Sequence, residues 1–210
     1  MCPRKYDSHR RQAAVETTRA RILEAARSLI GGKGDLAEFS MELLARRAGV
    51  SRMTIYYQFH SRAELFVALA DHLAERGGMH RVREAFQEPD PEKALRKLVS
   101  TFVEFWASDR VTLRRLRAMG IVFPKEAGPT RDRDAWRRSA VSQLLIAKFG
   151  PRVRGARGMP AADLVDVLTS LTSFETFDEL CTEMRTPPAV AELLADQAAR
   201  LVAPAGRAGH

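Results

Sequence analysis

The chain has 210 residues, of which 45% are hydrophobic and 29% charged, and its formal net charge is +8. This size and composition indicate a globular protein with one large helical domain, or with a small domain joined to a larger one. They argue against a membrane protein, because no apolar run approaches about 18 residues and no hydrophobic stretch follows the basic N-terminus. We therefore expect no signal peptide and a location in the cytoplasm.

Charge is unevenly distributed along the chain. Residues 1–62 hold twelve Lys and Arg against six Asp and Glu, whereas residues 160–203 hold two against eight. A basic N-terminal part and an acidic C-terminal part are typical of a protein that presents one end to a polyanion. Residues 63–159 hold nineteen Lys and Arg against twelve Asp and Glu. We interpret these central charges as solvated surface charge.

The first 16 residues are basic and contain few apolar side chains, so we expect residues 1–16 to form a flexible arm. Such an arm either strengthens attraction to phosphates or is a plain disordered terminus. From residue 17 onward the apolar side chains recur at helical spacing, as at Ile22, Ala26 and Ile30, up to the glycine pair that ends the helix.

Two short helices meeting at a glycine are predicted between residues 40 and 59. Ser40 suits the N-cap of the first, Gly49 suits a C-terminal position with positive φ, and Ser51 suits the N-cap of the second. This order of signals is typical of a helix-turn-helix motif. A helical hairpin inside another kind of protein would carry a similar glycine turn.

The second helix of this motif leaves a cationic and aromatic surface facing outward. Arg52 offers a guanidinium for guanine, Met53 offers apolar atoms for a thymine methyl, and the phenols of Tyr56 and Tyr57 suit phosphate oxygens. Arg62, in the first turn of a third helix, opposes the helix dipole, which favours an external anion beside it.

Residues 18–71 resemble the DNA-binding domain of TetR-type transcriptional regulators. The helix beginning at Thr18 is similar to the first helix of that family, and Tyr56, Tyr57, Gln58 and Phe59 match its Tyr-Tyr-X-Phe signature. The resemblance implies DNA binding through the residues of the motif. We assign to this interface Ser40, Ser51, Arg52, Met53, Thr54, Tyr56, Tyr57, Gln58 and Arg62.

Three positions depart from the family pattern. Gln58 stands where the family usually has His, Arg62 stands where it usually has Lys, and the loop at residues 34–39 is about one residue longer. Because Gln and Arg keep the hydrogen-bonding and charge roles, these departures concern the operator sequence and leave DNA binding in place.

The rest of the chain is predicted to be helical. Leu65, Phe66, Leu69 and Leu73 form the inner stripe of a helix that follows Ser61. In the resembled family this helix links the DNA-binding domain to the ligand domain. Further helices are expected over residues 79–88, 91–107, 109–119, 130–149, 161–181 and 189–202.

The segment 161–181 has apolar residues around well over half its circumference, which is too wide for one buried stripe. It can pair with the segment 189–202, and two such pairs from two subunits would close a four-helix bundle, as TetR-like proteins do. Packing within one subunit is the alternative. The dimer interface predicted on this basis consists of Leu164, Leu168, Leu171, Phe177, Leu194 and Leu201.

Family resemblance also implies a pocket for a small apolar inducer among the central helices. Aromatic residues at helical spacing are equally consistent with a plain core. The predicted pocket residues are Phe102, Phe105, Trp106, Met119, Phe123, Trp136 and Phe174.

No enzyme motif and no metal-ligand spacing is present in the sequence, so we expect no catalysis, metal or cofactor. The prediction is an all-α homodimer with a helix-turn-helix DNA-binding domain at residues 17–62, a larger helical ligand-binding and dimerisation domain at 63–203 and a disordered tail at 204–210. It would be a repressor released from a palindromic operator by a ligand. The alternative is a ligand-independent DNA-binding protein with a solid C-terminal domain, and the sequence identifies neither inducer nor operator.

Overall fold

The computed structural model describes the backbone of residues 5–122 and 128–202, and the side chains of residues 10–120 and 130–202. Helices account for nearly all of this part of the chain, apart from short loops and two isolated β-bridges. The all-α prediction is therefore confirmed. The first elements are α1 (Lys5–Gly31), η1 (Leu36–Glu38), α2 (Met41–Ala48), α3 (Arg52–Phe59), α4 (Arg62–Arg76), η2 (Met79–Arg81) and α5 (Val82–Gln87). They are followed by α6 (Pro91–Ser108), α7 (Arg110–Val122), α8 (Gly128–Phe149), η4 (Ala156–Gly158), α9 (Ala161–Leu171), α10 (Phe174–Leu180) and α11 (Pro187–Leu201).

The chain divides into two compact units. The first, which we call the head, comprises residues 1–72 and 111–129, and the second comprises residues 73–110 and 130–210. The expected boundary at residue 62 is therefore displaced, because Leu65, Phe66 and Leu69 in the first turns of α4 are buried in the head. Helical periodicity predicts which side chains are buried. It does not tell to which of the two cores they belong.

The head has a small core shared by its first four helices. Ile22 and Ile30 of α1, Leu44 of α2, Ile55 of α3 and Leu69 of α4 are fully buried. Burying one such aliphatic side chain contributes about 1.5–3 kcal/mol. This core fixes the orientation of α3 with respect to α1 and α2.

Helix α7 packs on the head although it follows α6 of the second unit in sequence. Thr112 is buried, and a Cβ at Gly31 would lie only 2.4 Å from its Oγ1. Arg115 also donates a hydrogen bond to the carbonyl oxygen of Gly34. Because only glycine leaves room for this approach, Gly31 joins the end of α1 to α7 as well as ending a helix.

The core of the second unit is built around α6. Asp90 caps this helix by accepting a hydrogen bond from the backbone N–H of Lys93 at 2.8 Å, and Pro91 suits the first turn. Its buried face packs against α5 and α11. At the surface, hydrogen bonds from Arg96 to Asp196 and then to Glu92 raise the pKa of Arg96.

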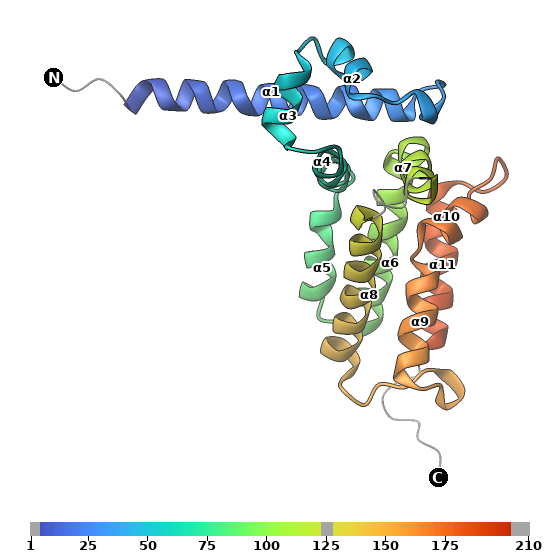
Figure 1. Ribbon diagram of the computed structural model, residues 1–210. Helices are drawn as coiled ribbons and strands as arrows, with labels where there is room; N and C mark the ends of the chain where they lie inside the picture. Colours follow the sequence, from blue (N-terminus) through green and yellow to red (C-terminus); the bar gives the residue numbers. More distant parts are fainter. Residues whose placement is uncertain (1–4, 123–127, 203–210) are drawn as a thin grey trace. The chain divides into compact units, whose positions relative to one another are not determined.

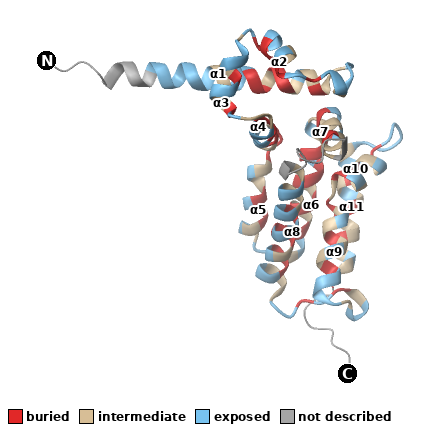
Figure 2. Cartoon of the chain, viewed as in Figure 1, coloured by how far each residue is buried: buried red, intermediate tan, exposed pale blue. Residues whose placement is uncertain are grey.

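The N-terminal segment differs from the expected flexible arm. Helix α1 already begins at Lys5 and continues without interruption to Gly31. The residues from Arg10 to Thr17 are all exposed (Figure 2). Its alanines, glutamine and arginines are good helix formers, which lets it extend a helix nucleated in the core. The predicted tail at 204–210 lies outside the described residues.

In the described part of the chain, every helix is too short or too polar to cross a membrane.

Candidate nucleic-acid interface

The turn between α2 and α3 has the expected cap geometry. The Ser40 hydroxyl accepts a hydrogen bond from the N–H of Leu43 at 3.1 Å, and the Ser51 hydroxyl accepts one from the N–H of Thr54 at 3.0 Å. Between them Gly49 has a φ of 63°, in the left-handed region that glycine adopts without strain. Both helix starts are fixed locally, so α3 leaves the turn at a defined angle.

The outward side of α3 carries large side chains that the protein leaves bare. Met53 is 76% exposed and Tyr57 is 77% exposed, while Arg52 and Tyr56 also face solvent. Large apolar and aromatic groups at this exposure mark an interaction surface when they cluster on one element. We call Arg52, Met53, Tyr56 and Tyr57 the reading face.

Thr54 and Gln58, also predicted to contact DNA, are only half exposed. The Thr54 hydroxyl lies 2.8 Å from the Ser51 hydroxyl, so it belongs to the cap of α3. The backbone carbonyl of Gln58 accepts a hydrogen bond from Arg19. Both residues therefore have structural contacts in addition to their predicted role.

Arg62, for which a phosphate contact was predicted, makes contacts within the head. Its guanidinium lies 5.4 Å from the ring centroid of Phe39 and 5.5 Å from that of Phe66. Cation–π contacts of this kind contribute about 0.5–1 kcal/mol when partly exposed. Arg62 therefore joins the loop before α2 to the start of α4, and a phosphate contact stays a prediction.

Arg19 fixes the C-terminal end of α3, a role that could not be predicted from the sequence. Its Nη1 donates a hydrogen bond to the carbonyl oxygen of Gln58 at 2.8 Å, and its guanidinium lies 4.3 Å from the centroid of the Phe59 ring. A cation at the C-terminal carbonyls also complements the helix dipole. Its partners are 39 and 40 residues further along the chain, and no local pattern links them to it.

Replacing Arg19 by methionine is expected to lower the free energy of unfolding by about 1.5–3 kcal/mol, because the variant loses a hydrogen bond from a charged donor and a cation–π contact. Arg21→Met is the matched control, since Arg21 is exposed two residues along the same helix and should change stability by less than about 0.5 kcal/mol. Urea denaturation measures both. Equal effects of the two substitutions would contradict the role of Arg19.

Most of the predicted pocket residues that the structure describes are buried in the second unit. Phe105, Trp106 and Phe174 are buried against one another in the second unit, with ring centroids 4.6 Å apart for Phe105 and Trp106 and 5.5 Å apart for Trp106 and Phe174. Phe102 is buried beside Trp136, which is itself 50% exposed. Phe102, Phe105, Trp106 and Phe174 are thus buried, and their place in a ligand pocket stays a prediction.

Two further predicted pocket residues lie elsewhere. Met119 is on α7, which belongs to the head, and Phe123 lies outside the described residues. A groove of about 540 Å³ lies between α8 and α9, lined among others by Ser139, Ile146 and Val165. None of the predicted pocket residues lines this groove.

The predicted dimer interface is largely core as well. Leu164, Leu168, Phe177 and Leu194 are buried within a single chain, so they have no free area to bury against a partner. Leu171 and Leu201 are half-buried, and their place in an interface stays a prediction.

The physical reason is a break in the segment that we expected to be one helix. Helix α9 ends at Leu171, and Ser173 takes an extended conformation and caps the new helix α10. The break changes the rotational phase of the side chains, so apolar residues on either side of it can face the same core. The wide apolar surface predicted for one helix with two buried sides is therefore divided between two helices.

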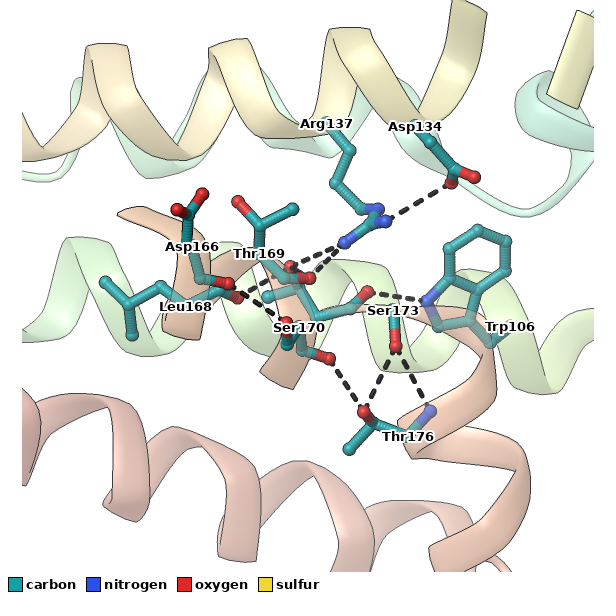
Figure 3. A network of polar contacts seen from close by, with 10 residues as sticks. Trp106, Asp134, Arg137, Asp166, Leu168, Thr169, Ser170, Ser173 and Thr176 are labelled. Carbon is teal, nitrogen blue, oxygen red and sulfur yellow. Dashed lines mark hydrogen bonds and ion pairs between the residues drawn. The ribbon is translucent and has the colours of Figure 1, made fainter. Parts of the chain in front are cut away.

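A buried arginine holds this break together. Arg137 of α8 points at the end of α9 (Figure 3) and donates hydrogen bonds to the carbonyl oxygen of Thr169 and the hydroxyl of Thr172. The indole Nε1 of Trp106 donates to the carbonyl oxygen of Thr172 at 3.0 Å. The last carbonyls of a helix lack intrahelical donors, and these two side chains supply them.

The fold and the reading face together define an all-helical protein with a helix-turn-helix motif in its head and a second helical unit. Residues 22–69 match the family model described as bacterial regulatory proteins, tetR family. This segment of the chain is therefore similar to the DNA-binding domain of TetR-type transcriptional regulators.

The sequence is 37% identical over 91 residues to the regulator TtgR of Pseudomonas putida, a match that covers 43% of each chain. It is 32% identical over 106 residues to EthR of Mycolicibacterium smegmatis, covering 50% of this chain and 45% of EthR. The chain thus matches a little under half the length of these curated relatives. Among solved structures, NalD of Pseudomonas aeruginosa is 26% identical, with a TM-score of 0.64 over 92% of this chain and 100% of NalD.

Proposed function

We propose that this regulator is a homodimeric repressor in the cytoplasm, that it inserts α3 of each subunit into a major groove of a palindromic operator, and that a small apolar ligand releases it. The observation that carries the proposal is the reading face. Two phenols, a thioether and a guanidinium are left in solvent on a short helix that caps and a buried core hold rigidly. NalD, which has the same fold, is described as the secondary repressor of the MexAB-OprM multidrug efflux pump.

Each reading-face residue has a role in this proposal that follows from its chemistry. Arg52 and Met53 lie in the first turn of α3, the part of a recognition helix that reaches base edges. Tyr56 and Tyr57 lie one turn further on, where phenol hydroxyls can donate to phosphate oxygens. Two such helices would enter half-sites about 34–36 Å apart.

Arg52→Ala is expected to lower operator affinity by about 1–3 kcal/mol and to relax the preference at one base pair of each half-site, because a bidentate contact to guanine is lost. Selection of bound sequences from random duplex DNA would identify the operator, and titrations with single-base variants would measure the preference. Arg131→Ala, an exposed arginine on α8, is the control. Unchanged affinity and preference in Arg52→Ala would remove this residue from base reading.

The packing of the second unit favours a second candidate, a DNA-binding protein that responds to no ligand. Phe105, Trp106 and Phe174 of the predicted pocket are buried and contact one another, and Phe174 contacts Phe177 of the same helix. Repeating the selection and titrations with apolar and cationic aromatic compounds separates the two candidates. A compound that lowers operator affinity must bind the DNA-free state more tightly, since a ligand shifts an equilibrium only by its differential affinity.

A further inference from the structure

The second unit has a groove of about 540 Å³ between α8 and α9, and Figure 1 shows these two helices joined by a loop at one end of that unit. This volume lies within the range of about 300–1,000 Å³ that is typical of small-molecule sites. The described residues that line the groove include none of the buried aromatic side chains of the unit. The groove is therefore distinct from the predicted pocket and large enough for a ligand of its own.

The groove has an apolar floor. Leu145 of α8 and Val153 of the loop are buried, Val165 of α9 is half-buried, and all three line the groove. Ala161 and Ala162 in the first turn of α9 are exposed, and their short side chains leave the groove open there. An alkyl chain lying on this floor would remove apolar surface from water, which stabilises a complex.

A cation lies at one end of the groove. Arg138 is the one charged residue among the described residues of the lining, and it precedes Leu145 by seven residues, or about 10 Å along α8. Its Nη1 donates a hydrogen bond to Asp166 of α9, so the ion pair crosses from one wall of the groove to the other. Both side chains are about half exposed, and exposed ion pairs are weak. Because a guanidinium has five N–H donors, Arg138 can also bind the carboxylate of a ligand.

The surroundings of Arg138 favour an anion as well. The Ser139 hydroxyl accepts a hydrogen bond from Nε2 of Gln143 at 2.9 Å, so its own proton can be donated to a ligand oxygen. Residues 138–166, which form most of the groove, hold five Lys and Arg against two Asp. This excess makes the potential around the groove positive, which attracts an anionic group and repels a cationic one.

We propose that the groove between α8 and α9 binds an amphipathic carboxylate, with the carboxylate against Arg138 and the apolar part over Leu145 and Val165. Charge complementarity at one end and the apolar floor along the rest select this class of ligand. The proposal deepens the proposed function, on which it rests for the release of DNA, because it gives the apolar ligand a site and an anionic group.

The probe is octanoate, titrated into the DNA-free full-length chain by isothermal calorimetry, with octylammonium and hexanoate as matched compounds. Octanoate should bind at one site per chain and about tenfold more tightly than octylammonium, because only the anion pairs with Arg138. Hexanoate lacks two methylenes and should bind about 4–15-fold more weakly than octanoate, since each fully buried methylene contributes about fourfold in affinity.

Two variants change the groove and one leaves it intact. Arg138→Gln should weaken octanoate binding about tenfold and remove the preference over octylammonium, and glutamine maintains helix propensity. Ala162→Trp should prevent octanoate binding, because the indole fills the open part of the groove. Arg200→Gln on α11 removes the same charge from an exposed residue outside the lining and should bind octanoate like the parent. Circular dichroism confirms that each variant keeps its helix content.

Equal affinities of the parent for octanoate and octylammonium, or unchanged octanoate affinity in both groove variants, would overturn the proposal. So would a change in the mass of Ala162→Trp by light scattering, because a second copy would then cover the groove.

Operator affinity separates this proposal from the proposed function. Octanoate should lower the affinity of the parent for its selected operator and leave that of Ala162→Trp unchanged. Octanoate binding that changes no operator affinity would refute release by this ligand and leave the site in place. A parent chain that selects no DNA sequence would instead refute the regulator itself.

Discussion

Replacing Arg137 by methionine is expected to lower the free energy of unfolding by about 2–4 kcal/mol, the largest stability effect that we predict. Arg137 is only 5% exposed and donates to the carbonyl oxygen of Thr169 at the end of α9. Methionine has a similar length, so little cavity forms, and the cost comes from polar groups left without their donor. The Asp134 carboxylate, 3.2 Å from Arg137, is one-third exposed, and water can solvate it in the variant.

The neighbouring arginine provides the control. Arg138 pairs with Asp166 at the surface, and both side chains are about half exposed. Exposed ion pairs contribute about 0–1 kcal/mol, so Arg138→Met should be nearly neutral. Urea denaturation of both variants measures the difference. A loss below about 1 kcal/mol for Arg137→Met would show that the break between α9 and α10 is held by its apolar packing alone.

The second large effect is expected from substitutions on the surface of α9 and α11, where some apolar side chains are only half-buried within a single chain. Val167 of α9 and Leu193 of α11 are apolar and only partly buried, unlike Leu164, Leu168 and Leu194 of the same helices, which are buried. We propose that these two residues lie in the dimer interface. Val167→Asp/Leu193→Asp would place charges there, which desolvation and like-charge repulsion make unfavourable.

This double variant should have a monomeric mass by light scattering at micromolar concentration and should lose operator affinity by about 10²–10⁴-fold, because the second head no longer binds from an effectively high local concentration. Ile146→Asp on α8, where Ile146 is 51% exposed, is the control. A dimeric double variant would exclude this surface. Dissociation of Ile146→Asp instead would place the interface at the groove between α8 and α9, and a monomeric parent chain would refute the homodimer.

Much of the local structure of the head could be predicted from the sequence. Ser40, Gly49 and Ser51 each act within four residues of the groups that they satisfy, so the pattern of residues carries the whole interaction. The exposed side of α3 could also be predicted, because helical periodicity separates Ile55 and Phe59 from the reading face. The family match at residues 22–69 covers the same segment and agrees with the resemblance that these signals indicated.

Predictions failed where a partner lies far along the chain. A predicted helix over residues 161–181 is broken at Ser173, and its apolar width reflects two helices rather than two interfaces. The expected flexible arm is helical because the core at Ile22 and Ile30 nucleates α1, which local composition does not reveal.

By itself, the sequence determined the helix-turn-helix, its caps, the chemistry of the reading face and the all-helical class, since these depend on groups within one or two turns of each other. Only the tertiary structure decided that Arg19 fixes α3, that Arg137 holds the end of α9 and that α7 belongs to the head. Burial and hydrogen bonding between distant segments depend on how helices pack in three dimensions, and the periodicity of one helix does not contain that information.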